Sequence, residues 1–250
     1  MILHIPDGYI PLWQCAIYYI IAIVFLYFAL RWSRNNLNEK NIPLMGVLAA
    51  GIFAIMSMNI PVPFGSSGHM VGAAMVSIIF MSPWAGVICI AMVLMVQAIF
   101  FGDGGVTTYG ANVINMGVIG SFVGFYMWQI LKKPRLGGLL NLGKYWSVGV
   151  AAWIAIFLAA CMAAVEMALA GTFPIQLGLL YMGGFHAMIG IFEAIITVIV
   201  VFTLQRVRPD LLAWNSKKNV DEFDLSTDTQ DEREPPEGKG KVPPEEAPSQ

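Results

Sequence analysis

Residues 83–100 read PWAGVICIAMVLMVQAIF and contain no charged side chain. An apolar run of this length approaches the roughly 20 residues that an α-helix needs to cross the hydrocarbon core of a bilayer. The whole chain has the same character, because 57% of its 250 residues are hydrophobic and only 12% are charged. A soluble domain carries about 25% charged residues. The composition therefore argues against a water-soluble enzyme, a nucleic-acid-binding protein and a disordered protein, and it indicates an integral membrane protein.

Further apolar stretches lie on both sides of this run. Seven stretches in all predict transmembrane helices, over residues 11–30, 43–58, 69–81, 83–100, 109–131, 145–170 and 184–206. The second and third are short, and residues 59–68 between them contain two prolines and two glycines, which interrupt a helix. Irregular backbone at membrane depth persists only where protein covers it or where it lines a cavity. The sequence therefore predicts an all-α integral membrane fold of about seven spans, with residues 59–68 as one wall of a site.

Lysine and arginine are distributed unevenly between the connections of the predicted helices. All nine basic residues that precede residue 211 fall in connections on one side: Arg31, Arg34, Lys40, Lys132, Lys133, Arg135, Lys144, Arg206 and Arg208. Because basic connections stay on the cytoplasmic side, the N-terminus is expected outside and the C-terminus in the cytoplasm. Seven spans also place the two ends on opposite sides, so the helix count and the charge agree.

Residues 211–250 differ from the rest of the chain. They hold ten acidic and five basic side chains and five prolines, with almost no apolar residue after Leu225. Such a segment cannot bury enough apolar surface to fold by itself. We therefore divide the chain into a polytopic membrane domain, residues 1–210, and a disordered acidic cytoplasmic tail, residues 211–250. Ordering of the tail on a partner is the alternative.

All three histidines are expected near the outer face of the membrane. His4 lies in the N-terminal segment, His69 follows the broken connection and His186 begins the last predicted helix; Asp7 and Asp103 are expected on the same side. A histidine close to a free amine can chelate a metal through the amine, a deprotonated amide nitrogen and the imidazole. Such nitrogen ligands suit Ni²⁺ or Cu²⁺ and can accept Co²⁺, and His69 could supply a fourth. The alternatives are a solvated terminal histidine and a hydrogen-bonded structural one.

Short motifs follow one another along residues 4–206. They read HIPDGYIP from His4, GSSGH ending at His69, QAIFFGDGG over 97–105, GANVINM over 110–116, and HAMIG followed by EA over 186–194. In this combination the chain resembles the CbiM/NikM family, the substrate-specific membrane subunits of energy-coupling-factor transporters for cobalt and nickel. The resemblance implies that the metal is held by the free N-terminal amine, by His4 with its backbone nitrogen, and by His69. Residues 1–210 would then be a metal-binding domain.

The start of the chain departs from the family pattern. The family histidine is the second residue, after the initiator methionine, whereas here it is the fourth. We hypothesise that Leu3 is the true initiator, because a UUG codon is read as leucine internally but initiates with methionine. If Met1 is the true start, its amine lies too far from His4 for the same ring, and His4 and His69 remain as ligands. The intact mass of natively expressed protein distinguishes the two.

Other polar residues are candidates for the surroundings of the metal or its cavity: Asp7, Asp103, Asn112, Asn115 and His186. The Asp7–Gly8 pair is expected to form a turn, with a hydrogen bond from Asp7 to an imidazole as the alternative. Asn112 and Asn115 are three residues apart and share a helix face, which favours a place beside the cavity. For His186, contact near the metal and structural hydrogen bonding both stay open.

Two acids, Glu166 and Glu193, fall inside predicted helices, where an ionised group is costly and often functional. Pairing with a polar group such as Asn115 is expected for Glu193, and a protonated carboxyl is the alternative. Gly120 and Gly124 form a GxxxG pattern that lets two helices approach closely. Internal packing is the expected use of this pattern, and docking of a partner subunit is the alternative.

The resemblance implies a function as well as a site. The chain is expected to capture Co²⁺ or Ni²⁺ at the cell membrane as a multi-pass component of an ATP-driven importer, with cobalt favoured for cobalamin biosynthesis. It is expected to be no enzyme, to hold no permanent cofactor and to bind no nucleic acid. ATP would be hydrolysed by separate ATPase subunits, joined by a membrane coupling subunit and a small accessory membrane subunit. The alternatives are a metal-independent small-molecule transporter with structural histidines and a membrane enzyme or haem protein.

Overall fold

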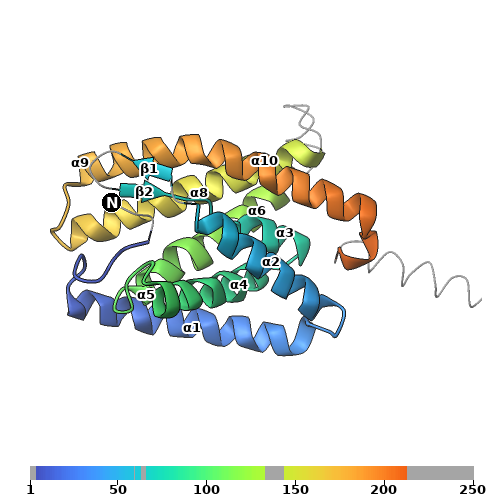
Figure 1. Cartoon of the computed structure of the whole chain (residues 1–250), viewed down its shortest axis with the longest axis horizontal. Helices are drawn as coiled ribbons and strands as arrows, with labels where there is room; N and C mark the ends of the chain where they lie inside the picture. The colour runs from blue at the N-terminus through green and yellow to red at the C-terminus, as the bar shows by residue number, and fades with distance from the viewer. Residues whose placement is uncertain (1–3, 59, 63–65, 133–143, 213–250) are drawn as a thin grey trace, which may run out of the picture.

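The structure is a computed structural model and describes residues 4–58, 60–62, 66–132 and 144–212 (Figure 1). Its helices and strands are α1 (Leu12–Asn36), α2 (Asn41–Met56), β1 (Ile60–Val62), β2 (Ser66–Gly68), α3 (Ala73–Ile79), α4 (Pro83–Val96), η1 (Gln97–Phe101), α5 (Tyr109–Asn112), η2 (Val113–Ile119), α6 (Gly120–Leu131), α8 (Lys144–Leu169), α9 (Ile175–Gly178), η3 (Leu179–Gly183), α10 (Gly184–Val207) and η4 (Pro209–Leu211). Met1, Leu3 and the acidic tail beyond residue 212 lie outside the described residues.

Prolines and glycines of the sequence mark where several helices begin. Pro83 is the first residue of α4, where a backbone N–H has no partner within the helix, so that its absence in proline costs no hydrogen bond. Pro11 and Pro174 precede α1 and α9 in extended conformation. Gly72 precedes α3 with a φ of 74°, a left-handed conformation that glycine adopts without strain. The chain therefore turns into these helices at positions that the sequence specifies.

The expected all-α membrane fold is confirmed, with one small addition and three differences in helix length. The addition is a two-stranded antiparallel sheet of β1 and β2 in the broken connection. Five helical segments are long and apolar enough to cross a membrane: Leu12–Asn36, Pro83–Phe101, Tyr109–Leu131, Tyr145–Leu169 and Ile175–Val207. The segment expected over 69–81 contains only the seven residues of α3, all buried, and seven residues rise about 10 Å, too little for a bilayer. The count of seven spans and the orientation stay predictions.

The first and last long helices exceed their predicted lengths. α1 runs to Asn36, because Arg31 and Arg34 continue the helix beyond the apolar run. The last helical segment begins at Ile175 and passes through the Gly183–Gly184 pair without a break. Gly183 lies close to α8, where an added Cβ would lie 3.4 Å from Phe157 and 3.5 Å from Cys161. The glycine therefore serves a close helix contact and does not end the helix.

The long helices α1, α8 and α10 run along the long axis of the molecule, and the short α3 lies between α1 and α10 (Figure 1). α10 packs on α8, α8 on α6, α6 on α3, α3 on α4, and α4 on α1. α1 and α10 therefore form opposite sides of the bundle. The beginning of the described chain lies at the same end of the molecule as β1 and β2 (Figure 1). This arrangement brings the N-terminal segment to the broken connection.

The GxxxG pattern of the fifth apolar stretch serves the internal packing that was expected for it. A Cβ added to Gly120 would lie 3.0 Å from Ala73 Cβ, and one added to Gly124 would lie 2.4 Å from Ala74 Cβ. Both alanines belong to α3, so the backbone of α6 lies directly against α3. Small residues at this contact allow the short central helix to be covered completely.

The Gly124→Ala substitution is expected to destabilise the protein by about 1–3 kcal/mol through overpacking against α3. The added methyl group would also lie 2.8 Å from Ala74 Cα, which is backbone and cannot rotate away. Thermal unfolding of the purified protein in detergent measures the loss. Gly184→Ala is the matched control, because nothing lies within 4 Å of a Cβ at that helical position. Equal melting temperatures for the two variants would contradict this packing.

Candidate metal centre

The N-terminal segment, residues 4–10, is fixed by hydrogen bonds to a distant part of the chain. The side chain of Asn112 bonds both sides of the Ile5 residue: Ile5 N donates to Oδ1 at 2.8 Å, and Nδ2 donates to Ile5 O at 3.1 Å. Ile5 O also accepts from Gly105 N at 3.2 Å and from the Thr108 hydroxyl. Asn112, expected beside the cavity, therefore holds the residue that follows His4.

The Asp7–Gly8 pair forms the expected turn. Tyr9 N donates to Pro6 O at 3.4 Å, and Gly8 has a φ of 85°. The Asp7 carboxylate accepts from the hydroxyl of Thr107 at 2.5 Å and from its backbone N–H at 2.7 Å. These hydrogen bonds, of which the one from the Thr107 hydroxyl has the largest effect, hold the pKa of Asp7 below its usual range. Asp7 therefore fastens the N-terminal turn to the loop that precedes α5.

Two imidazoles, His4 and His69, lie against each other at this end of the bundle. Their ring centroids are 4.4 Å apart with an interplanar angle of 32°, and both side chains are fully buried. His4 Nδ1 lies 3.1 Å from Asp103 Oδ1, and His69 Nδ1 lies 3.0 Å from Met70 O. Because both partners are acceptors, the Nδ1 that faces each of them carries a proton, and Nε2 of a neutral ring carries the lone pair. Neither Nε2 has a hydrogen-bond partner among the described residues.

The protonation states of His69 and Asp103 favour the binding of a cation beside the pair. Burial, followed by the neighbouring His4 ring, lowers the pKa of His69 to about 3. The hydrogen bond from His4 is the main reason why the pKa of Asp103 is lowered. His69 is therefore neutral and Asp103 ionised at physiological pH. A neutral imidazole beside a carboxylate-bound imidazole is an arrangement that metal-binding proteins use repeatedly.

Acid is expected to destabilise the fold through His69. The unfolded imidazole binds a proton below its ordinary pKa of 6.5, whereas the folded one does so only near pH 3. Stability should therefore fall as the pH drops below 6.5 and continue to fall towards 3. Melting temperatures of the wild type and of His69→Gln, measured from about pH 7 to about pH 5, test this. Equal pH slopes for the two proteins would contradict it.

The other residues that the sequence suggested for this site do not all contact the His4–His69 pair. His186 is buried, its Nδ1 lies 2.8 Å from Met182 O, and its Nε2 has no partner in the part of the chain that the structure describes. That Nε2 lies 3.4 Å from where a Cβ on Gly68 would be, so His186 faces the residue before His69. Within residues 4–58, 60–62, 66–132 and 144–212, no group of three or more His, Cys, Asp or Glu side chains could hold a metal ion.

Glu193 is paired with polar groups as expected, but Asn115, the example that the sequence offered, is not its partner. Asn115 Nδ2 donates instead to Glu166 Oε2 at 2.6 Å, which joins η2 to α8. Glu193 accepts from the backbone of Val71 and Gly72. Helical spacing indicated that these groups would be buried, but it did not indicate their partners. The carboxylates of Glu166 and Glu193 come from different helices, and only the packing of α8 and α10 decides which polar group each one meets.

Comparisons with known proteins agree with this site and fold. Residues 4–211 match the CbiM family, described as the cobalt uptake substrate-specific transmembrane region. The chain is 38% identical over 217 residues to a Methanocaldococcus jannaschii protein named for metal transport, covering 84% of this chain and 94% of that protein. It is 34% identical over 225 residues to the fused nickel transport protein NikMN of Rhodobacter capsulatus, covering 84% of this chain and 64% of that protein.

A solved structure has the same fold. The crystal structure of a transition metal transporter superposes with a TM-score of 0.74 at 31% identity, covering 86% of this chain and 98% of the other. The family match begins at His4 and spans every described helix. The chain therefore belongs to the CbiM/NikM family of multi-pass membrane proteins that transport cobalt and nickel.

Proposed function

We propose that this protein captures Co²⁺ or Ni²⁺ at the outer face of the plasma membrane through His4, His69 and the N-terminal nitrogen atoms. The observation that carries the proposal is the buried contact between the His4 and His69 rings, in which His69 Nε2 lacks a hydrogen-bond partner among the described residues. A buried nitrogen without a partner is costly unless a ligand satisfies it. Nitrogen donors suit Co²⁺ and Ni²⁺, whereas Mg²⁺ and Ca²⁺ prefer oxygen.

The N-terminal nitrogen atoms are the least direct part of this ligand set. The chelate of the family uses the amine, the His4 amide nitrogen and His4 Nδ1. In this structure Asp103 holds that Nδ1 at 3.1 Å. Chelation therefore requires His4 to exchange Asp103 for the metal. Hydrogen bonds on Ile5 and Asp7 keep the segment at the site while His4 makes this exchange.

The surrounding residues then have supporting roles. Before metal binds, Asp103 fixes the orientation of the His4 ring through Nδ1, and Asn112 fixes the backbone next to it. Asn115 ties η2 to α8 through its bond to Glu166. His186 borders the His69 segment at Gly68. We assign none of these four side chains as a direct metal ligand.

The transport step requires partners. We propose that a membrane coupling subunit and separate ATPase subunits drive release to the cytoplasm, as in energy-coupling-factor importers, with a small accessory membrane subunit. The fused relative of Rhodobacter capsulatus supports an accessory segment, because this chain covers only 64% of it. Cobalt, used for cobalamin synthesis, is the favoured cargo because the matching family is described by cobalt uptake.

Metal content by mass spectrometry tests the function. Protein purified after growth with Co²⁺ and Ni²⁺ should retain about one metal ion per chain, and its intact mass gives the true N-terminus. An intact mass that corresponds to a chain starting at the Leu3 codon would support the three-nitrogen N-terminal chelate. Absence of bound metal would favour the rival proposal, a metal-independent transporter whose histidines are structural.

A further inference from the structure

We propose that Glu193 is the positioning residue that holds the segment carrying His69, residues 68–72, in its metal-binding place. This inference deepens the proposed function and rests on it for the effect on metal binding. The position of the segment itself can be tested without metal. The sequence offers no local reason for such a role, because Glu193 lies more than 120 residues away on α10.

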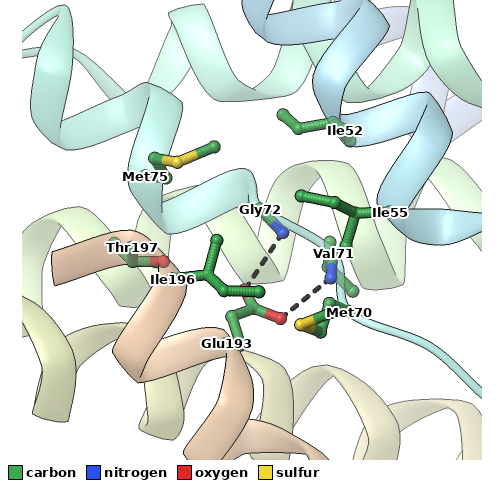
Figure 2. Close-up of a pocket in the computed structure, with 9 residues that line it drawn as sticks. All are labelled: Ile52, Ile55, Met70, Val71, Gly72, Met75, Glu193, Ile196 and Thr197. Atoms are coloured by element: carbon green, nitrogen blue, oxygen red, sulfur yellow. Dashed lines mark hydrogen bonds between the residues drawn. The ribbon is translucent and has the colours of Figure 1, made fainter. Parts of the chain in front are cut away.

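Both oxygens of the Glu193 carboxylate bind the backbone that follows His69. Val71 N donates to Oε2 at 2.8 Å, and Gly72 N donates to Oε1 at 3.0 Å (Figure 2). Glu193 is only 3% exposed. Each oxygen of this buried side chain therefore has its own backbone N–H partner. The carboxylate therefore holds two consecutive peptide groups in a single orientation.

The helices adjacent in sequence cannot supply these bonds. Gly72 is the residue before α3 and has a left-handed φ of 74°, so the N–H groups of Val71 and Gly72 precede the first turn and have no intrahelical acceptor. The cavity beside the carboxylate has a volume of about 10 Å³ and is lined largely by apolar side chains, including Ile52, Met70 and Met75. It has room for about one water molecule. Glu193 is the acidic side chain that lines it (Figure 2).

The other end of the segment also rests on α10. A Cβ on Gly68 would lie 2.3 Å from Ile189 Cδ1 and 3.4 Å from His186 Nε2, so the backbone there lies directly on the helix. His69 follows Gly68, and its Nδ1 lies 3.0 Å from Met70 O within the same segment. α10 therefore supports the segment on both sides of His69. Loss of the carboxylate would free one side and let the imidazole move away from His4.

Hydrogen–deuterium exchange of the full-length protein in detergent tests the position directly. In Glu193→Ala the amides of Val71 and Gly72 should exchange at least about tenfold faster, because each loses a buried acceptor. Glu193→Gln keeps one acceptor oxygen and should give an intermediate rate. Glu166→Gln is the matched control, a buried acid on α8 that bonds Asn115 and not this segment. It should leave these amides unchanged.

Exchange rates of the peptides that cover α4 distinguish a local positioning role of Glu193 from a general loss of stability. Cys89 lies there and is fully buried. Faster exchange confined to residues 68–72 supports the proposal, whereas equal acceleration in α4 would overturn it and assign Glu193 to the fold as a whole. Unchanged exchange at Val71 and Gly72 in Glu193→Ala would also overturn it.

Metal affinity is the second readout. Calorimetric titration with Ni²⁺ should show a loss of roughly 10- to 100-fold in Glu193→Ala and a partial recovery in Glu193→Gln, the range found when a group that orients a ligand is removed. Wild-type affinity in Glu193→Ala would overturn the positioning role. A wild-type chain that binds no Ni²⁺ or Co²⁺ would instead overturn the proposed function, and the exchange rates would still decide where the segment is held.

Discussion

The His69→Ala substitution is expected to lower Ni²⁺ and Co²⁺ affinity by more than about 100-fold, because removal of groups that merely orient a ligand already costs 10- to 100-fold. The substitution removes the Nε2 that faces no other partner in the described chain and leaves His4 without its neighbouring ring. Isothermal titration calorimetry of the purified protein measures the affinity, and uptake of radioactive metal by cells measures transport. Both should fall together.

The control for this result is a substitution of similar size away from the site. Met188→Ala qualifies, because Met188 is 64% exposed on α10. It should bind metal as the wild type does. If His69→Ala retained wild-type affinity, the buried pair would be structural and the metal would be bound by other residues.

The Asn112→Ala substitution is expected to weaken metal binding roughly 10- to 100-fold while leaving both imidazoles in the chain. It removes the acceptor for Ile5 N and one donor to Ile5 O, so the N-terminal segment loses the side chain that fixes it from both sides. Ile5 N would remain buried without an acceptor, which costs about 1–3 kcal/mol and favours release of the segment. Calorimetry gives the affinity, and amide exchange of residues 4–10 reports the release.

Asn36→Ala is the control for Asn112, because the exposed Asn36 side chain donates to Trp32 O at the far end of α1, within its own helix. It should leave affinity and exchange unchanged. Unaltered metal binding in Asn112→Ala would mean that the bonds from Gly105, Thr107 and Thr108 place the N-terminal segment without Asn112.

The candidate site was predictable from sequence only as a set of residue types. The motifs identified His4 and His69 because each lies in a stretch typical of the family, and the proline–glycine connection indicated a cavity wall. The partners of these residues were not predictable. His4 meets Asp103, Ile5 meets Asn112, and Val71 meets Glu193, at separations of 99, 107 and 122 residues. Helical periodicity describes neighbours three or four residues apart and has no information on such pairs.

The sequence by itself determined that the protein lies in a membrane and that its fold is α-helical. Apolar runs near the bilayer length, few charges, and prolines at helix starts act locally, so they can be read without the fold. Only the tertiary structure decided that the third apolar segment is a short buried helix, that Gly183 and Gly184 continue a helix, and that Glu193 holds the His69 segment. Each depends on which helices pack together, and that is settled by burial and hydrogen bonding over the whole chain.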